Sequence, residues 1–276
     1  MEKWIDTHSH YNHRKINDLK LINEMFKTND KIITIGTDIE SNTETLRLIS
    51  YYEDMYGMIG FFPNDAYVLE EDFVGKKTSE DNWNVFIHQL INQKLVGIGE
   101  IGLDLHHNNF GKKDCEIKGP KAIEYQMKYL EKQLLLAKDL EKPVSLHSRD
   151  AIIPTREIFD KFDEIKGVMH CFSYGVKEAS YYLDKGLYLG VGGTITYKSN
   201  VQLREAIKET PIERILLETD APYLTPFPFR GKTNNSSYIE YVILTIADIK
   251  KIEPNEVIRI TNQNAYNLFK FDKKTA

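Results

Sequence analysis

The sequence predicts an α/β fold, a TIM (β/α)8 barrel, from three observations: short β-rich apolar runs, longer helical patterns between them, and the chain length. The 276 residues are 41% hydrophobic, and a barrel of this type takes about 250 residues. Strands that alternate with helices imply parallel βαβ units, and eight such units imply closure. Because no repeat, linker or domain boundary is visible, we expect residues 1–276 to form a single domain.

Eight apolar runs rich in Ile, Val, Leu, Met, Tyr and Phe are expected to form the strands. In chain order they are Lys3–Thr7, Lys31–Thr37, Tyr56–Phe61, Val96–Leu103, Pro143–His147, Gly167–His170, Leu187–Gly192 and Arg214–Glu218. The spacing of apolar residues predicts amphipathic helices between them, such as Ile123–Leu140 and Ser199–Glu209. Three further helical segments are expected after the last strand: Tyr238–Ile249, Pro254–Ile260 and Asn264–Phe269.

The stretch His106–Pro120 is the least regular part of the chain, a polar loop after the fourth strand. A loop of this length is long for a βα connection and is consistent either with a functional lid or with a tolerated surface insertion. His106 and His107 open this loop, where we expect surface exposure.

Charge and cysteine content limit the possible functions. The formal net charge is -5, whereas proteins that hold nucleic acid by electrostatics alone are usually basic. If the protein acts on phosphates, bound metal ions must supply the local positive charge. Cys115 and Cys171 form no CxxC motif and no disulfide framework, which indicates a reducing compartment. With no apolar signal region and no long apolar run, we expect a cytoplasmic protein with no membrane association. No obligate protein partner is indicated.

Histidines and acids lie at or near the ends of five predicted strands. Because the carboxyl ends of barrel strands meet on one face, where barrel active sites lie, these groups are expected to converge. The candidates are His8, His10, Glu100, His147, His170 and Asp220. Each has a simpler explanation, since a lone histidine can be a polar cap and Glu100 a core acid held by hydrogen bonds. Four of the eight histidines fall at these ends, however, and this favours a metal site.

The residue types indicate how such a site could work. His8 and His10 are two residues apart, so on a strand both side chains point to one side. Glu100 can bridge two cations through its two oxygens, and Asp220 can complete the first ion and hold the attacking water. Imidazole with carboxylate suits zinc, manganese or, less well, magnesium. Cys171 could ligate zinc beside His170, but neighbours on a strand point opposite ways, so we expect it to be a small buried residue. His88 is expected to be structural.

Several segments together resemble the TatD family of metal-dependent hydrolases, often called TatD-type DNases. They are DTHSH, GEIGLD, LHSRDA, MHCFS, LLETDAPYLTP, RGKTN with the following Tyr238, and TNQNAYNLF. The resemblance covers nearly the whole chain and implies a barrel of the amidohydrolase-like kind. It implies two divalent metal ions, Mg, Mn or Zn. One ion would be held by His8, His10, Glu100 and Asp220, and the other by Glu100, His147 and His170.

The same resemblance implies a deoxyribonuclease that trims DNA, possibly also RNA, from the 3′ end. The ions would polarise the phosphodiester and lower the pKa of a bound water. Asp220 would orient that water or take its proton, so Asp220 and Glu100 are the expected catalytic residues. The sequence departs from the family at Phe62 and Asn64, where histidines are usual, which puts a third metal or a substrate contact there in doubt. Tyr174 replaces a usual glycine and could narrow the pocket.

Five polar residues near the expected mouth are candidates for holding phosphate: Arg149, Arg230, Lys232, Asn234 and Tyr238. The planar fork of arginine suits phosphate oxygens. A structural role is equally open, because Arg149 could pair with Asp150 and Lys232 could be solvated. Tyr223 could stack on a base or pack beneath its loop.

Three functions therefore remain. The first is a metal-dependent phosphodiesterase, a 3′→5′ exonuclease on DNA. The second is an amide or ester hydrolase, deacylase or lactonase-like, on a small or tRNA-linked substrate, because an activated water attacks carbonyls as well. The acidic charge and Phe62 favour this second reading slightly. The third is a barrel that binds a partner without catalysis, which only Phe62 supports.

Overall fold

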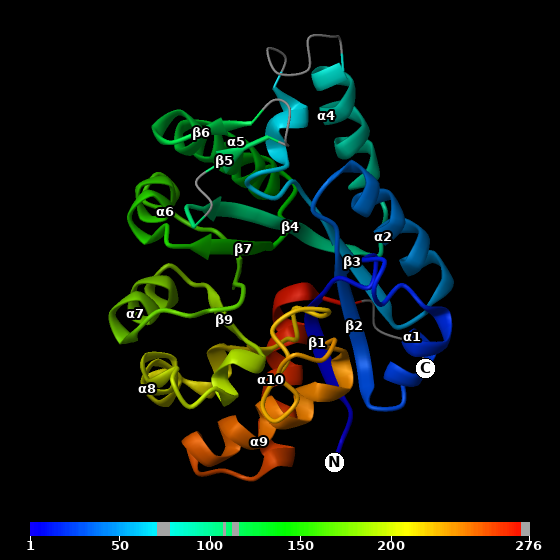
Figure 1. Cartoon of the computed structure of the whole chain (residues 1–276), viewed down its shortest axis with the longest axis vertical. Coiled ribbons are helices and arrows are strands. Elements are labelled where there is room, and N and C mark those ends of the chain that lie inside the picture. Colours follow the sequence, from blue (N-terminus) through cyan, green and yellow to red (C-terminus); the bar gives the residue numbers. More distant parts are fainter. Residues whose placement is uncertain (71–77, 107–108, 112–115, 272–276) are drawn as a thin grey trace.

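Eight parallel strands form a nearly closed barrel with helices around it (Figure 1), which confirms the predicted TIM barrel. The structure is a computed structural model and describes residues 1–70, 78–106, 109–111 and 116–271. The strand order is β1-β2-β3-β4-β7-β8-β9-β10. The strands are β1 (Trp4–Ser9), β2 (Asn29–Ile35), β3 (Met55–Ile59), β4 (Leu95–Asp104), β7 (Val144–Arg149), β8 (Gly167–Met169), β9 (Tyr188–Val191) and β10 (Ile215–Leu217).

The first and last strands meet at the seam of the barrel. The hydroxyl of Thr7 donates to the carbonyl of Leu217 over 2.9 Å, and Ser9 forms a parallel bridge with Ala221. All eight predicted strands are confirmed, with boundaries that differ from the prediction by two residues at most. The β-rich runs were sufficient to place them because nearly all strand residues are buried, as in parallel sheets that are covered on both faces.

Helices cover the outside of the barrel (Figure 1). They are α1 (Leu19–Met25), α2 (Ile39–Tyr51), α4 (Thr78–Gln89), α5 (Pro120–Asp139), α6 (Ile152–Phe159), α7 (Val176–Asp184), α8 (Val201–Glu209), α9 (Ile239–Lys250) and α10 (Pro254–Phe269). Short 3-10 turns lie at η1 (Ala66–Leu69), η2 (Gly193–Thr196), η3 (Ile212–Arg214) and η4 (Ser236–Tyr238). His88 lies within α4, as its helical pattern indicated.

The two last predicted helical segments are one continuous helix, α10, so the predicted break is wrong. The polar residues of the supposed break are satisfied without interrupting the helix. Thr261 donates its hydroxyl to the carbonyl of Val257 over 2.8 Å. The side-chain NH₂ of Asn262 donates to the carbonyl of Lys3, and its Oδ1 accepts from the backbone N–H of Ile5. Those bonds attach α10 to the start of β1.

The stretch predicted as an irregular loop contains a small antiparallel sheet of β5 (Asn109–Phe110) and β6 (Ile117–Lys118). Phe110 is fully buried and its ring stacks on Tyr125 of α5 with centroids 4.9 Å apart. An apolar anchor therefore fixes this part of the segment to α5. His107 and Cys115 lie outside the described residues.

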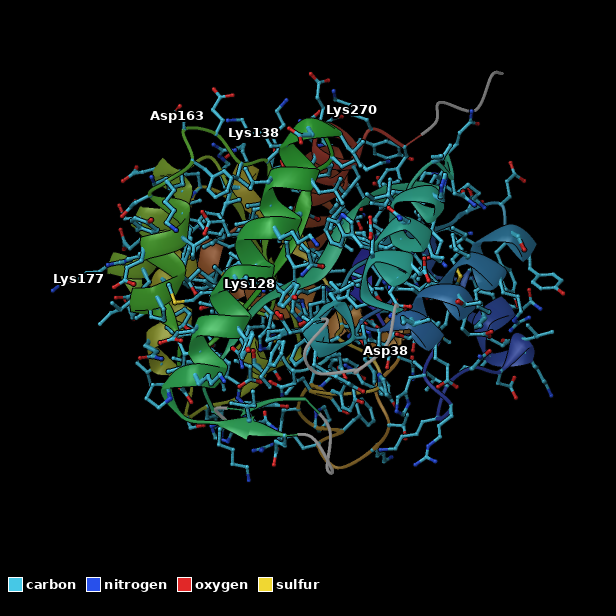
Figure 2. All side chains as sticks on the ribbon, turned by 90° about the horizontal axis from the view of Figure 1, so that it is seen from above. Asp38, Lys128, Lys138, Asp163, Lys177 and Lys270 are labelled. Atoms are coloured by element: carbon cyan, nitrogen blue, oxygen red, sulfur yellow. The ribbon has the colours of Figure 1, made fainter. Side chains whose placement is uncertain are left out.

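The amino-terminal end of the barrel is closed by α10. Leu268, Phe269 and the following Phe271 share an apolar cluster with strand residues such as Ile5 and Val96, near the starts of β1 and β4. Figure 2 shows charged side chains such as Lys177 and Lys270 projecting outward. In the described part of the chain, no helix has the length and apolarity needed to cross a membrane.

One lysine is an exception to the rule that cations lie outside. The side chain of Lys31 on β2 is only 4% exposed, and its ammonium lies 3.2 Å from a carboxylate oxygen of Asp54. The same ammonium lies 5.4 Å from the ring centroid of Tyr56 and 5.8 Å from that of Phe271. The ion pair and the aromatic faces together compensate for the burial of this charge.

Candidate active site

Two histidines of the first strand lie side by side at the carboxyl end of the barrel. His8 belongs to β1 and His10 lies just after it, with their Nε2 atoms 3.3 Å apart. The Nδ1 of His8 shares a 2.9 Å hydrogen bond with the hydroxyl of Ser145. The Nδ1 of His10 donates to the carbonyl of Ile35 over 2.9 Å. Because the barrel wall holds one ring nitrogen of each histidine, the other nitrogens face a common space.

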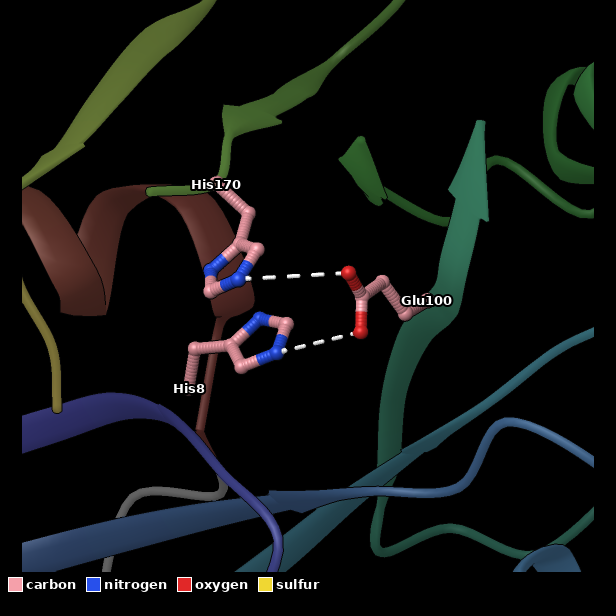
Figure 3. A group of neighbouring side chains, drawn as sticks. All are labelled: His8, Glu100 and His170. Atoms are coloured by element: carbon pink, nitrogen blue, oxygen red, sulfur yellow. Dashed lines mark ion pairs between the residues drawn. The ribbon is translucent and has the colours of Figure 1, made fainter. Parts of the chain in front are cut away.

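Glu100 projects from β4 toward these histidines, and its side chain is 5% exposed. Its Oε2 lies 3.6 Å from Nε2 of His8 and 3.6 Å from Nε2 of His10. Its Oε1 lies 2.8 Å from Nδ1 of His147. Figure 3 shows the two carboxylate oxygens facing His8 and His170 from the opposite side. One oxygen thus faces each histidine group, which is the arrangement that a bridging carboxylate needs.

His147 and His170 form the second group. His147 lies on β7, and its Nε2 is 3.6 Å from a carboxylate oxygen of Asp104. His170 follows β8 directly, and its Nε2 is 3.9 Å from Oε1 of Glu100. The ring of His170 stacks on that of His8, with centroids 3.4 Å apart and an interplanar angle of 14°. The stacking fixes the plane of both rings.

Asp220 approaches from the loop after β10, with Oδ1 3.2 Å from Nε2 of His10. Its φ of 58° is left-handed, a conformation that costs about 1–2 kcal/mol for a residue with a Cβ. Positive φ recurs in other loops that follow strands at this end, at Asp150, Cys171 and Leu224. Gly102 of β4 also has positive φ, and a Cβ there would lie 1.9 Å from the carbonyl oxygen of His147. Four of the seven non-glycine residues with positive φ in the described chain therefore lie in loops at this end of the barrel.

The spacing of these atoms fits a metal ion. The Nε2 atoms of His8 and His10 lie 3.3 Å apart, and their distances to Oε2 of Glu100 and to Oδ1 of Asp220 run from 3.2 to 3.9 Å. Ligands about 2.0–2.2 Å from a tetrahedral zinc ion are separated by about 3.3–3.6 Å. The His8, Glu100 and His170 atoms converge in the same way. Because Nδ1 of His10 donates to the carbonyl of Ile35, its Nε2 carries a lone pair that faces Nε2 of His8 and can bind a cation.

The electrostatics put three of the six candidate ligands in the forms that bind metal. Burial, with the charge of neighbouring His170, lowers the pKa of His8 to about 4. Burial alone would raise the pKa of Glu100, but hydrogen-bonded histidines outweigh it and hold that pKa well below its usual range. Burial also opposes ionisation of Asp220, yet the hydrogen bond with His10 and the charge of His170 lower its pKa. At neutral pH His8 is therefore a neutral imidazole, and both acids are carboxylates. For the other three, burial opposes protonation, but neighbouring carboxylates outweigh it and raise the pKa of His10, that of His147 to about 8 and that of His170 to about 10, so a metal ion has to displace a proton there.

The six residues line or border a cavity of about 1510 Å³ that extends from the barrel mouth over α2. Of the five predicted phosphate-binding residues, Arg149 lines this cavity. The other four lie outside its lining in the described chain. Arg230 stacks over Tyr197 at 4.3 Å and Lys232 lies 5.2 Å from the ring of Phe229. Tyr238 stacks on the same Phe229, and Asn234 is fully buried.

Arg149 does not pair with Asp150, the structural alternative that the sequence left open. Asp150 instead lies 3.0 Å from Nδ1 of His106. Within the described chain Arg149 forms no ion pair, and its side chain is exposed at the cavity. Tyr223 also lines the cavity, 45% exposed, with its ring 6.3 Å from that of His10.

The prediction for Cys171 is wrong. β8 ends at Met169, so strand alternation no longer applies, and positive φ turns Cys171 toward the cavity, which it lines partly exposed. Phe62 and Asn64 line the cavity too, and the Phe62 ring contacts His147 edge-on at 4.8 Å. Tyr174 donates its hydroxyl to the carbonyl of Ser148 over 3.0 Å, outside the cavity lining.

Three buried acids beside the site were not identified from the sequence: Asp6, Asp104 and Glu218. Asp6 accepts hydrogen bonds from the hydroxyls of Thr219 and Ser236, over 2.7 and 2.6 Å, and so holds the seam next to His8. Burial raises the pKa of Asp6 to about 7. Each acid lies in or next to a strand at a position that apolar residues usually occupy, and this was the signal available in the sequence.

A parallel barrel that gathers imidazole and carboxylate groups with this spacing at its carboxyl end defines the class of metal-dependent hydrolases. The family model described as TatD related DNase matches residues 5–270. The chain belongs to this family.

Relatives cover almost the whole chain. The uncharacterized metal-dependent hydrolase YabD of Bacillus subtilis is 34% identical, over 97% of this chain and 99% of that protein. The uncharacterized metal-dependent hydrolase MG009 of Mycoplasma genitalium is 33% identical, over the same shares. The crystal structure of YJJV, a TatD homolog from Escherichia coli, is 28% identical with a TM-score of 0.80 and covers 98% of each chain.

Proposed function

We propose that the protein is a deoxyribonuclease that removes nucleotides from a 3′ end by phosphodiester hydrolysis. The observation that carries this choice is Arg149, an exposed guanidinium without an ion pair in the described chain, in the cavity that also holds the candidate ligands. An unpaired arginine beside a cluster of carboxylates and imidazoles is suited to hold a phosphate oxygen. The family description, TatD related DNase, supports the same substrate class.

Each group has a role in this proposal. His8, His10, Glu100 and Asp220 would hold one divalent ion, and Glu100 would share the other with His147 and His170. When bound, the ions would supply Lewis-acid polarisation of the phosphodiester and would lower the pKa of the attacking water.

The remaining chemistry belongs to the side chains. Asp220 is a carboxylate at neutral pH, so it can accept a proton from the attacking water. Arg149 would hold a nonbridging phosphate oxygen and so orient the scissile bond. Tyr223 offers an exposed ring for the terminal base, because stacking needs only an aromatic face.

An oligonucleotide labelled at its 5′ end tests the proposal. With added Mg²⁺, Mn²⁺ or Zn²⁺ we expect a ladder of shortened strands. The Asp220→Asn variant should produce no ladder, and adding more metal should not restore it. Arg149→Ala should weaken the use of DNA, while Arg230→Ala, an exposed arginine outside the cavity, serves as its matched control. A fully loaded protein that leaves every nucleic acid intact would exclude nuclease activity.

The second candidate is hydrolysis of an amide or ester. It is favoured by the acidic part of the cavity over α2, where Asp38, Glu40 and Asp65 lie and where Arg47 is already paired with Glu44. A polyanion is repelled there, whereas a neutral or cationic substrate is not. A panel of lactones, N-acyl compounds and aminoacyl esters, assayed with the same metal-loaded protein, distinguishes the two candidates.

A further inference from the structure

Glu218 is a buried carboxylate for which the proposed reaction has no use. It follows β10 directly and is fully buried. Its Oε1 lies 3.0 Å from Nδ1 of His170 and accepts a 2.6 Å hydrogen bond from the backbone N–H of Cys171. Its Oε2 has no hydrogen-bond partner, and no lysine or arginine of the described residues pairs with it. A carboxylate buried with so little compensation is costly to the fold.

The barrel wall is shaped around this carboxylate. Gly190 lies on the neighbouring strand β9, and a Cβ at that position would lie 2.2 Å from Oε2 of Glu218. The carboxylate therefore occupies the space that a side chain at position 190 would fill. The absence of a side chain at Gly190 thus makes room for the Glu218 carboxylate next to His170.

The two ring nitrogens of His170 face opposite partners. Nε2 lies 3.6 Å from Oδ1 of Asp220 and 3.9 Å from Oε1 of Glu100, toward the candidate metal centre. Nδ1 faces Glu218. A neutral imidazole carries one proton, and a carboxylate can only accept it, so the proton belongs on Nδ1 and the lone pair on Nε2.

A metal ion between His170, Cys171 and Glu218 is the competing explanation, because their potential ligand atoms lie within 4.8 Å of one another. The contact between Nδ1 and Oε1 argues against it. At 3.0 Å it is a hydrogen-bond distance, and the same Oε1 also accepts the 2.6 Å hydrogen bond from the backbone N–H of Cys171. Two donors therefore already point at this oxygen, which explains the cluster without a cation.

We propose that Glu218 is a positioning residue that fixes the Nδ1-protonated form of His170 and thereby selectively strengthens the binding of the second metal ion. The carboxylate orients the ring, selects the nitrogen that binds metal and makes that nitrogen a stronger donor. The first ion has different support, since the hydroxyl of Ser145 and the carbonyl of Ile35 hold His8 and His10. This inference rests on the proposed two-ion centre.

Stepwise titration with Mn²⁺, followed by electron paramagnetic resonance against a competing chelator, tests the selectivity. We compare the wild type with Glu218→Gln, which keeps the volume and loses the charge, and with Ser145→Ala as the reciprocal control. Glu218→Gln should weaken the second ion about 10- to 100-fold and change the first by less than about threefold. Ser145→Ala should weaken the first ion instead. Circular dichroism and thermal melting check that each variant is folded.

The tautomer of His170 is measured without any variant, by ¹⁵N NMR of the wild-type protein loaded with Zn²⁺. A proton on Nδ1 supports the proposal, and a proton on Nε2 or zinc on Nδ1 overturns it. The proposal is also overturned if Glu218→Gln binds each ion as tightly as the wild type does. It is overturned as well if the variant loses affinity for both ions equally and melts at a lower temperature, because that result marks a structural role. A wild type that binds no second ion is a different result, because it removes the proposed two-ion centre itself.

Discussion

Replacing Asn234 with alanine separates a substrate contact from a structural role. The sequence made Asn234 a phosphate-binding candidate, whereas the structure buries its side chain completely. Its amide NH₂ donates to the carbonyls of Thr219 over 2.9 Å and of Tyr223 over 2.6 Å. Its Oδ1 accepts from the N–H of Asn235 over 2.9 Å. Asn234 therefore joins both sides of the loop that presents Asp220.

The expected cost follows from these bonds. Each hydrogen bond contributes about 1 kcal/mol net, and a buried carbonyl left without a donor costs about 1–3 kcal/mol. Because the Thr219 carbonyl is buried and the exposed Tyr223 can rebind water, we expect Asn234→Ala to lower the free energy of unfolding by about 2–4 kcal/mol. For a chain of this size, that corresponds to a fall in Tm of roughly 3–7 °C.

Differential scanning calorimetry of the metal-free protein measures this loss, with Lys232→Ala as the control. Lys232 is exposed in the same loop, so its removal should change the unfolding free energy by less than about 0.5 kcal/mol. For activity, a displaced loop lowers kcat because it moves Asp220. An unchanged Tm together with a raised KM and a normal kcat would refute this reasoning and return Asn234 to the substrate.

Three further results are expected. Because burial raises the pKa of Asp6 to about 7, its stabilising contribution is complete below about pH 4 and is lost as the pH rises through 7. Denaturant unfolding of Asp6→Asn should therefore show a weaker loss of stability from pH 5 to 8, and an identical slope contradicts this. Burial opposes protonation of His147, but Asp104 and Glu100 outweigh it and raise its pKa to about 8. Calorimetric Mn²⁺ affinity should accordingly rise from pH 6.5 to 8.5, and a flat profile contradicts it. Lys31→Ala should cost about 2–4 kcal/mol in urea unfolding, since it removes a buried side chain together with its ion pair to Asp54 and its contact with the Tyr56 ring, and a neutral effect shows that these contacts contribute nothing.

Convergence of the site could be predicted because it follows from topology alone. Once eight strands are parallel, residues at their carboxyl ends share one face whatever their separation in sequence. His8 and Asp220 are far apart in the chain, yet the seam hydrogen bond between the Asp220 N–H and the His8 carbonyl, 2.9 Å long, brings them together. The ligand candidates needed only the strand ends, and those were placed to within two residues.

The roles that the sequence could not reveal depend on the exact residue at which a strand ends and on which side chains contact each other in space. Cys171 was expected to point away from His170, and this failed because β8 ends two residues before it. Asn234 was grouped with Arg230 by proximity in sequence, although one is buried and the other exposed. Glu218 looks from the sequence like one more acid at a strand end. Only the space at Gly190 and the contact with His170 give it a role.

The charge distribution of the cavity bears on how a nuclease would act. Arg149 and the candidate metal ligands lie in the same cavity as the acidic residues of α2 and its approach. A strand that entered the acidic region would place successive phosphates near Glu40 and Glu44, at a cost that the paired Arg47 does not offset. The terminal base and sugar are neutral, so the acidic residues do not repel them. The acidic region therefore favours attack at the last phosphodiester over attack within a strand.

Reversing one charge in this region tests that argument. Glu40 is exposed, lines the cavity and forms no ion pair within the described chain, so Glu40→Lys should leave the fold intact and reduce the repulsion. We expect this variant to cut circular single-stranded DNA, which has no 3′ end, faster than the wild type does, at low ionic strength where the repulsion is least screened. Glu209→Lys, an equal charge change on the exposed face of α8, controls for net charge. If circular DNA stays intact while linear DNA is trimmed by both variants, the acidic region does not restrict cleavage to strand ends, and the shape of the cavity must do so.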